Sequence, residues 1–223
     1  MAEEEKKEGF KSGFVSIIGR PNAGKSTLLN TLLGEKVAII SNKPQTTRNR
    51  ILGIKNHPAG QIIFLDTPGI HQARSKLNQA MVKVALATYN EVDVVCFLIE
   101  ADRPDHEEND FILKTLNQVR NPVILVINKI DLVPKGDLLP IIENYSRLRP
   151  FEQIIPLSAL RGDGVDVLVA ELLQILPEGP QLFPKDMITD LPERFLAAEL
   201  IREKVFLLTR EEIPYSTAVV VEE

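Results

Sequence analysis

The sequence predicts an α/β fold with a mostly parallel six-stranded sheet and helices on both of its faces. Short apolar runs rich in valine and isoleucine alternate with stretches of helical spacing, and this alternation is typical of a parallel sheet. Several runs are apolar without interruption, as expected for strands that are buried on both sides. The predicted strands are Phe14–Ile18, Ile51–Lys55, Ile62–Leu65, Val92–Ile99, Val123–Ile127 and Ile154–Leu157.

The segments between these strands predict helices, with one exception. The link Asn56–Gln61 is too short for a helical crossover, so the two strands that it joins are expected to pair antiparallel. The predicted helices are Lys25–Leu33, Lys76–Tyr89, Glu107–Val119, Leu138–Leu148 and Val165–Leu176.

The chain is expected to extend beyond this α/β domain. The prolines and glycine of Pro177–Pro180 end the last helix. After them come a predicted helix, Leu191–Thr209, and a predicted strand, Tyr215–Val221, which together are too few to bury a core. This segment therefore either packs on the main domain or begins a further one. The predicted parts are a flexible tail (1–11), the α/β domain (12–177), a linker (178–190) and an incomplete further domain (191–223).

Composition narrows the classes of function. No apolar run approaches the roughly 18 residues of a transmembrane helix, and the acidic N-terminus lacks the apolar segment of a signal peptide. The single cysteine, Cys96, lies in an apolar run, which indicates a buried position in a reducing compartment. The net charge of −5 and the absence of tryptophan argue against a broadly basic, base-stacking surface for nucleic acid.

A phosphate-binding loop is predicted between the first strand and the first helix. The pattern G-x-x-x-x-G-K-[ST] uses glycines so that backbone N–H groups can wrap phosphates, and the helix N-terminus adds positive potential. Lys25 can reach the β- and γ-phosphates, and the Ser26 hydroxyl can bind Mg²⁺. The residues of the loop and the first helical turn are Gly19, Arg20, Pro21, Asn22, Ala23, Gly24, Lys25, Ser26 and Thr27. They predict a nucleoside-phosphate site.

Three further motifs follow predicted strands at their carboxyl ends, where α/β sheets bind ligands. Asp66 can hold Mg²⁺ through a water, and the Gly69 N–H can meet the γ-phosphate. Asp131 can accept hydrogen bonds from the N1–H and 2-amino group of guanine, which adenine cannot offer. A backbone N–H of the last motif can meet the guanine carbonyl. The motifs are Asp66-Thr67-Pro68-Gly69 with Ile70 after it, Asn128-Lys129-Ile130-Asp131, and Ser158-Ala159-Leu160.

Together these motifs resemble the translation-factor-like GTPases, and among them the bacterial members that end in an RNA-binding KH domain. The resemblance also rests on Pro44–Arg48, Arg194–Lys204 and Glu212–Ser216. It implies a P-loop GTPase domain followed by the start of an α+β KH domain. It further implies an enzyme that converts GTP to GDP and phosphate, and that assists small ribosomal subunit assembly and 16S rRNA maturation.

The same resemblance implies a monomer in the cytoplasm with peripheral contact at the inner membrane. No basic amphipathic helix or lipidation signal appears in the sequence. A KH domain grips RNA through a G-x-x-G loop, which this chain lacks, so the KH domain implied here is incomplete. RNA binding is carried over from the family rather than from residues of this chain.

Roles in hydrolysis also come from the resemblance. It implies that Thr47 binds Mg²⁺ in a first switch segment, with Thr46 as the alternative, and that Lys25, Thr47 and Gly69 act in catalysis. Ile70 stands where Ras-type proteins carry the glutamine that orients water, so unaided turnover is expected to be slow. Asn22 resembles the asparagine that holds K⁺ in related GTPases; alternatively, it only stabilises the loop turn.

Three other functions remain open. One is a related bacterial GTPase with another RNA client. A second is a GTP-dependent docking module with negligible hydrolysis, a hypothesis that Ile70 favours. The third is a P-loop kinase, which leaves the motif Asn128–Asp131 without a role.

Overall fold

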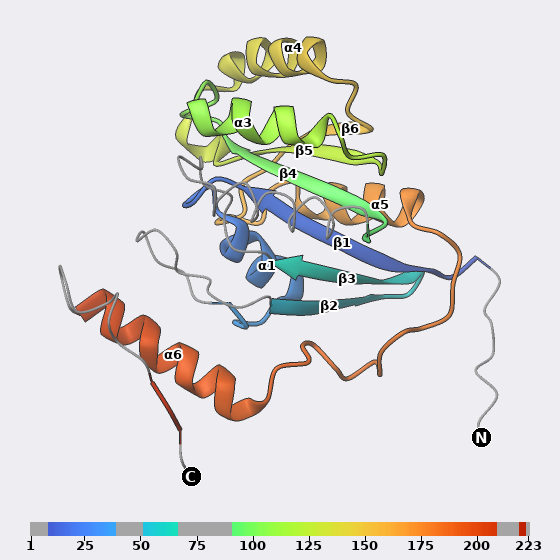
Figure 1. The fold of residues 1–223 in the computed structure, drawn as a ribbon, viewed down its shortest axis with the longest axis vertical. Helices are drawn as coiled ribbons and strands as arrows, with labels where there is room; N and C mark the ends of the chain where they lie inside the picture. The colour runs from blue at the N-terminus through green and yellow to red at the C-terminus, as the bar shows by residue number, and fades with distance from the viewer. Residues whose placement is uncertain (1–8, 39–50, 67–90, 209–218, 222–223) are drawn as a thin grey trace.

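The computed structural model of the chain describes residues 9–38, 51–66, 91–208 and 219–221. These residues form a six-stranded sheet in the order β2-β3-β1-β4-β5-β6 (Figure 1). β2 and β3 pair antiparallel, and the other neighbours pair parallel. The predicted fold class and the predicted antiparallel pair are therefore confirmed. The strands are β1 (Lys11–Gly19), β2 (Ile51–His57), β3 (Gly60–Asp66), β4 (Val94–Glu100), β5 (Val123–Asn128) and β6 (Gln153–Pro156).

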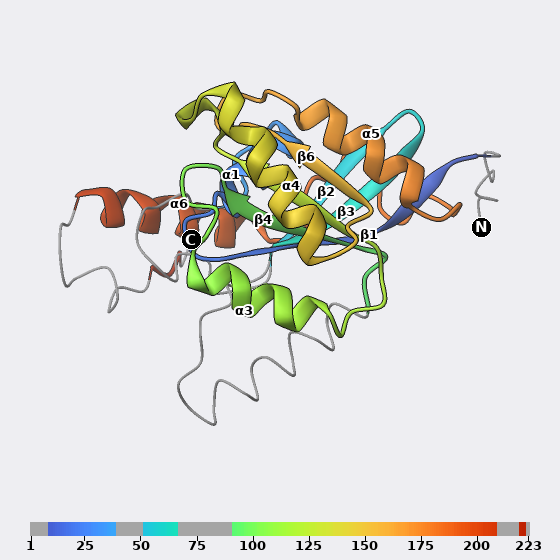
Figure 2. The same cartoon turned by 90° about the horizontal axis from the view of Figure 1, so that it is seen from above.

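Helices cover both faces of this sheet. Figure 2 shows α3 and α5 on opposite sides of it. The core clusters agree, since α1 and α5 contribute buried side chains to one cluster and α3 and α4 to the other. The α-helices among the described residues are α1 (Lys25–Leu33), α3 (Glu107–Leu116), α4 (Leu138–Leu148), α5 (Val165–Ile175) and α6 (Glu193–Leu208).

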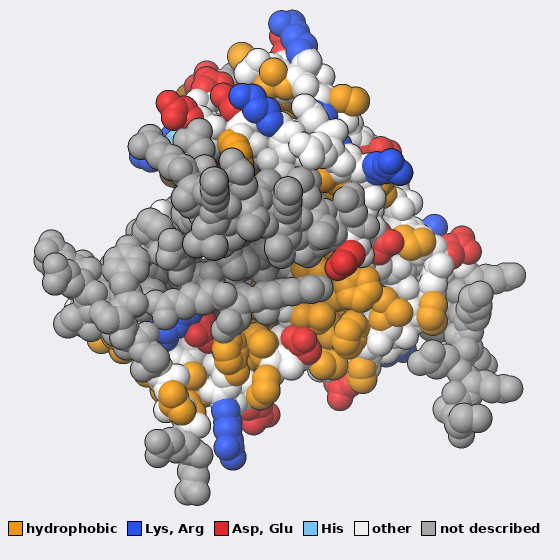
Figure 3. Space-filling view, viewed as in Figure 1, with side chains coloured by type: hydrophobic (Ala, Val, Ile, Leu, Met, Phe, Trp, Pro, Cys, Tyr) orange, Lys and Arg blue, Asp and Glu red, His pale blue; other side chains and the backbone are white. Residues whose placement is uncertain are grey.

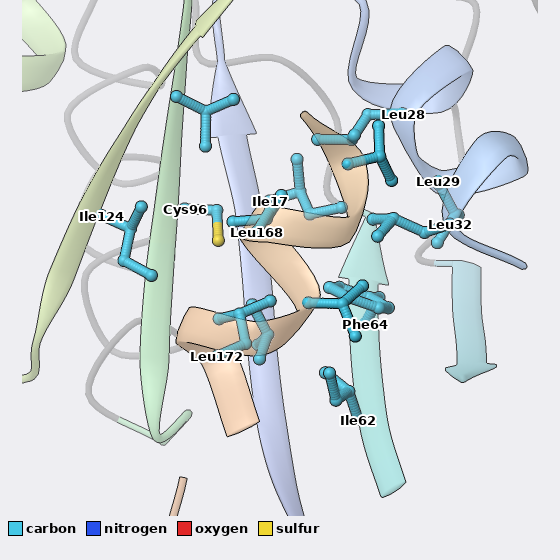
Figure 4. Close-up of a cluster of buried hydrophobic side chains, with 14 of the residues drawn as sticks. Ile17, Leu28, Leu29, Leu32, Ile62, Phe64, Cys96, Ile124, Leu168 and Leu172 are labelled. Atoms are coloured by element: carbon cyan, nitrogen blue, oxygen red, sulfur yellow. The ribbon is translucent and has the colours of Figure 1, made fainter. Parts of the chain in front are cut away.

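The uninterrupted apolar run of β4 supplies both core clusters. Val94, Cys96 and Leu98 pack on the side of α1 and α5, and the alternate residues pack on the side of α3 and α4. In Figure 4, Cys96 lies in the same cluster as Leu168 of α5, beside the buried side chains of neighbouring strands. A strand with helices on both sides must be apolar at every position, which explains the pattern in the sequence.

The predicted element boundaries shift at a few places. β1 begins at Lys11, at the end of the predicted tail, because the Lys11 N–H donates to the Ala59 carbonyl at 3.0 Å. α3 ends at Leu116 rather than Val119, and the Arg149 guanidinium donates to the Leu116 carbonyl there. The predicted helix Lys76–Tyr89 and most of the predicted strand Tyr215–Val221 lie outside the described residues, and residues 219–221 carry no regular secondary structure.

Residues 177–191, which we call the docked segment, run along the sheet to the edge strand β2 (Figure 1). The Ser12 N–H donates to the Pro177 carbonyl at 3.1 Å, and the Ile54 N–H donates to the Ile188 carbonyl at 2.7 Å. Most of the docked segment falls in the predicted linker. Its backbone is thus hydrogen-bonded to the α/β domain at both ends.

The buried side chain of Gln61 in β3 holds the middle of the docked segment. Its Oε1 accepts from the N–H groups of Leu182 and Phe183, at 2.8 and 2.9 Å. Its Nε2 donates to Asn56 Oδ1 at 2.7 Å and to the Phe183 carbonyl at 2.8 Å. All the hydrogen-bonding capacity of this amide is used, as a fully buried polar side chain requires.

α6 follows the docked segment and contacts the α/β domain. Lys36, just after α1, forms an ion pair with Glu203 of α6, with the Nζ and Oε1 atoms 2.7 Å apart. Figure 3 shows hydrophobic side chains gathered over the region of β2 and β3 and others along α6, mixed there with charged ones. None of the helices in the described ranges is both long and apolar enough to cross a membrane.

Candidate functional site

Three neighbouring parallel strands end together at one edge of the sheet. β1, β4 and β5 end at Gly19, Glu100 and Asn128, and Glu100 pairs directly with Asn128. The loops that follow these strands therefore meet at one place, as do ligand sites in other α/β sheets. The loop after β6, which contains Ser158–Leu160, joins them.

The phosphate loop places its lysine across its own backbone. Lys25 is the first residue of α1 and is buried, with 7% of its surface exposed. Its Nζ donates to the carbonyls of Gly19 and Arg20, at 3.0 and 2.9 Å. The ammonium group is thus held inside the loop at the N-terminus of a helix, where a phosphate group is bound best.

Left-handed backbone marks both predicted nucleotide loops. Among the described non-glycine residues, Asn22 and Lys129 have positive φ, at 65° and 64°. Asn22 lies in the phosphate loop, and Lys129 lies directly after β5. Such conformations cost free energy for residues with a side chain, and they gather at functional sites.

Gly24 allows the phosphate loop to touch β5. Its φ of 98° is left-handed, and a Cβ built on it would lie 2.3 Å from Asn128 Nδ2. Any side chain at this position would therefore push the Asn128 amide away. The sequence pattern predicts a glycine here so that the backbone can wrap phosphates. The structure adds a second reason, which is the close contact with Asn128.

The Asn128 side chain connects two loops that are far apart in the sequence. It is 2% exposed, its Nδ2 donates to the Ala23 carbonyl at 2.8 Å, and its Oδ1 accepts from the Ala159 N–H at 2.9 Å. The predicted phosphate loop and the loop after β6 are thus fixed relative to each other through one amide.

Asp131 is held by neighbours from the loop after β6. Its Oδ1 accepts from the Ser158 hydroxyl at 2.6 Å, and its Oδ2 lies 3.8 Å from Arg161 Nε. The Ser158 N–H itself donates to the Asp163 carbonyl at 2.9 Å. Since the carboxylate is oriented by these contacts, it can present its remaining acceptor capacity to a planar donor pair such as the N1–H and 2-amino group of guanine.

Sequence reasoning missed side chains that support these loops. The Thr31 hydroxyl of α1 is 2.7 Å from the Ala159 carbonyl, and no motif signals it. Glu100 is buried at the end of β4 between Arg20 and Lys129. A charged residue that ends an otherwise apolar run is the signal that could have found Glu100.

Several predicted site residues lie outside the described residues. These are Thr47 and its alternative Thr46 in the first switch segment, and Thr67, Pro68, Gly69 and Ile70 after β3. Asp66 is described as the last residue of β3, where its backbone pairs with Ile51. Their predicted roles stay predictions.

The described residues fit one part of a Mg²⁺ site. Ser26 lies in the first turn of α1, directly after the buried Lys25 and next to the phosphate loop. Within the described ranges, no group of three His, Cys, Asp or Glu side chains comes close enough to hold a metal ion. A site completed by phosphate oxygens and water, as nucleotide-bound Mg²⁺ has, needs no such group.

The fold and the loops define a class of protein, and comparison with known proteins agrees. Residues 14–129 match the family described as 50S ribosome-binding GTPase. This match contains the phosphate loop, most of β1, the strands β2 to β5, and Asn128. The protein is a P-loop GTPase.

Proteins with higher sequence identity to this chain show which family of P-loop GTPases it belongs to. The chain is 60% identical to the GTPase Era of Geotalea uraniireducens and to that of Geobacter metallireducens, over 96% of this chain and 72% of each relative. A single-residue variant of Aquifex aeolicus Era bound to GDP·AlF4⁻ matches with a TM-score of 0.88 and 49% identity. Era in complex with MgGDPNP and nucleotides 1506–1542 of 16S ribosomal RNA matches with a TM-score of 0.88 and 50% identity. Both matches cover 96% of this chain and 73% of the solved chain. The chain belongs to the Era family of GTPases.

Proposed function

We propose that this GTPase is a GTP-driven switch that assists assembly of the small ribosomal subunit and maturation of 16S rRNA. The observation that supports it most is on the base side of the site, where Ser158 and Arg161 hold the Asp131 carboxylate, the group proposed to read guanine. A relative 50% identical in sequence was solved with MgGDPNP and a segment of 16S rRNA, which supports the same ligand classes here.

The nucleotide contacts divide between the two sides of the site. On the phosphate side, the backbone of the loop wraps the phosphates and Lys25 neutralises the β- and γ-phosphates. On the base side, Asp131 reads the guanine edge and a backbone N–H of the loop after β6 meets the guanine carbonyl. The proposed contacts are Gly19–Thr27, Asp66–Ile70, Asn128–Asp131 and Ser158–Leu160.

Mg²⁺ is the proposed cofactor. Ser26 and Thr47 supply hydroxyl ligands, and Asp66 contacts the ion through water. When bound, the ion neutralises charge on the phosphate oxygens. Lys25, Thr47 and Gly69 are the proposed catalytic residues, acting on the γ-phosphate. Asn22, with its left-handed backbone, is a proposed ligand for K⁺ beside the phosphates.

The binding proposal is tested by calorimetric titration of the purified chain with GDP, GTP and ATP in Mg²⁺ buffer. We expect GDP and GTP to bind and a large excess of ATP to leave the GDP isotherm unchanged. Competition by ATP at concentrations similar to GTP contradicts the role given to Asp131 and favours a kinase-like site.

Hydrolysis is tested by phosphate release under single and multiple turnover. Because Ile70 cannot orient water, we expect slow turnover that is faster in K⁺ than in Na⁺ at equal ionic strength. Equal rates in the two salts contradict the K⁺ role of Asn22. Phosphate release no faster than in protein-free buffer would instead favour the docking module.

The ribosomal role, the cytoplasmic location with peripheral inner-membrane contact, and the monomeric state are proposals from the family. Depletion of the protein from its native cells should cause small-subunit precursors with immature 16S rRNA to accumulate. An unchanged ribosome profile would favour another RNA client. Fractionation of the same cells locates the protein, and light scattering of the purified chain gives its oligomeric state.

A further inference from the structure

A buried carboxylate lies between the two sides of the nucleotide site. Glu100 is the last residue of β4, and β4 lies between β1 and β5 in the sheet. Its Oε2 forms an ion pair with the Arg20 guanidinium, and its Oε1 forms one with the Lys129 ammonium. Arg20 belongs to the phosphate loop, and Lys129 belongs to the loop after β5, which carries Asp131 and is here called the base loop. One carboxylate thus contacts one cation from each loop.

The burial of this group makes the loss of any one partner costly. The Glu100 side chain is 5% exposed, Arg20 is 7% exposed and Lys129 is 29% exposed. Burial lowers the pKa of both the Arg20 guanidinium and the Lys129 ammonium, because desolvation disfavours their charged forms. Two neighbouring cations with so little water around them would repel each other without an anion between them.

Lys129 links Glu100 to the turn that carries Asp131, the carboxylate proposed to bind the base. Its left-handed backbone turns the chain from β5 into the short 3-10 helix Ile130–Leu132, which contains Asp131. A Lys129 side chain anchored on Glu100 therefore fixes the start of the turn that carries Asp131. On the other side, Arg20 is the first residue after β1, so its anchor fixes the start of the phosphate loop.

We propose that Glu100 is a positioning residue that couples the phosphate loop to the base loop, and that guanine selectivity depends on it. It contacts no nucleotide itself, since both of its oxygens face the protein cations. The role adds a charged connection to the neutral one that Asn128 makes between the phosphate loop and the loop after β6. The inference rests on the proposed nucleotide site.

The test compares Glu100→Gln with the parent chain in affinity for GDP and for IDP, which lacks the 2-amino group that Asp131 reads. We expect the variant to bind GDP about tenfold more weakly, and the preference for GDP over IDP to fall by several-fold. A general loss of stability would weaken the binding of GDP and of IDP alike and leave the ratio of the two affinities unchanged. Glu178→Gln is the matched control, because Glu178 forms an exposed ion pair with Lys11, at 3.9 Å, far from the loops.

A second variant covers the case in which Glu100→Gln does not fold. Glu100→Asp keeps the charge on a shorter side chain that cannot reach both cations, so we expect it to fold and to show the same fall in the GDP-to-IDP ratio. Thermal unfolding without nucleotide confirms that each variant is folded. A folded variant that keeps the parent's GDP-to-IDP ratio overturns the proposal, whether or not its GDP affinity falls. If the parent chain itself binds no GDP, it is the proposed nucleotide site that fails.

Discussion

Two buried amides, Asn128 and Gln61, connect distant segments of this molecule in the same way. Asn128 is 2% exposed and Gln61 is 0% exposed, and each binds backbone groups from segments far away in the sequence. Asn128 lies at the carboxyl end of β5, between the nucleotide loops, whereas Gln61 lies near the amino end of β3 and holds the docked segment. The hydrogen-bond geometry of the two amides does not tell which one serves a ligand site and which one only holds the fold together. Their positions do, because α/β sheets bind ligands at the carboxyl ends of parallel strands, where Asn128 lies.

The largest expected effect is that of Asn128→Ala on nucleotide binding. The change leaves the Ala23 carbonyl and the Ala159 N–H without their partner, at a cost of about 1–3 kcal/mol for each buried group. We expect GDP affinity to fall on the order of a hundredfold, measured by calorimetry. A variant that binds GDP like the parent would show that the two loops do not need this amide.

Gln61→Leu should reverse the pattern, with a large effect on stability and little effect on binding. The leucine leaves the partly buried N–H groups of Leu182 and Phe183 without their acceptor, so we expect a loss of about 2–4 kcal/mol in the free energy of unfolding by urea. GDP affinity should stay within about threefold, because the nucleotide loops are at the other end of the strands. Gln174→Leu, on the exposed side of α5, is the matched control. A hundredfold loss of GDP affinity in Gln61→Leu would erase the difference between the two amides.

Gly24→Ala tests the close approach of the phosphate loop to Asn128, on which the hydrogen bonds of the Asn128 amide depend. The new Cβ would lie 2.3 Å from Asn128 Nδ2, and left-handed backbone costs an alanine about 1–2 kcal/mol. We expect GDP binding to weaken by about tenfold, less than in Asn128→Ala, because the amide can shift and keep one partner. The double variant with Gly24→Ala and Asn128→Ala should lose less binding free energy than the sum of the two single losses. Additive losses would mean that Gly24 matters for the phosphates alone.

The smallest expected effect is the reaction of Cys96 with a thiol reagent, because we expect no labelling of this residue in the native protein. Burial raises the pKa of its thiol to about 12, so at pH 8 almost none of it is the reactive thiolate. Labelling by a disulfide reagent should begin only when the core opens, and Gln61→Leu should speed it in mild urea. Fast labelling of the folded parent chain at pH 8 would contradict the burial of this residue.

The parts of the structure that follow local rules were predictable. The apolar run of β4 indicates a strand between two helical layers, and the motif around Asn128 indicates its place in a nucleotide loop. A charge at the end of an apolar run marks Glu100 as unusual, but the roles of Glu100 and Gln61 were not predictable from their own neighbourhoods. Their roles depend on partners such as Arg20 and Phe183, which only the fold brings near. The docked segment, rich in turn residues, has the composition of a linker although hydrogen bonds fix it.

The pairing of the docked segment with β2 has a practical consequence for handling the protein. An outer strand with free N–H and carbonyl groups is a template on which other chains add, and this leads to aggregation. Here the Ile54 N–H is occupied by Ile188, and Gly53 pairs with Thr189. A fragment cut after α5 would uncover these groups and tend to precipitate. A GTPase fragment meant for expression should therefore extend through Leu191.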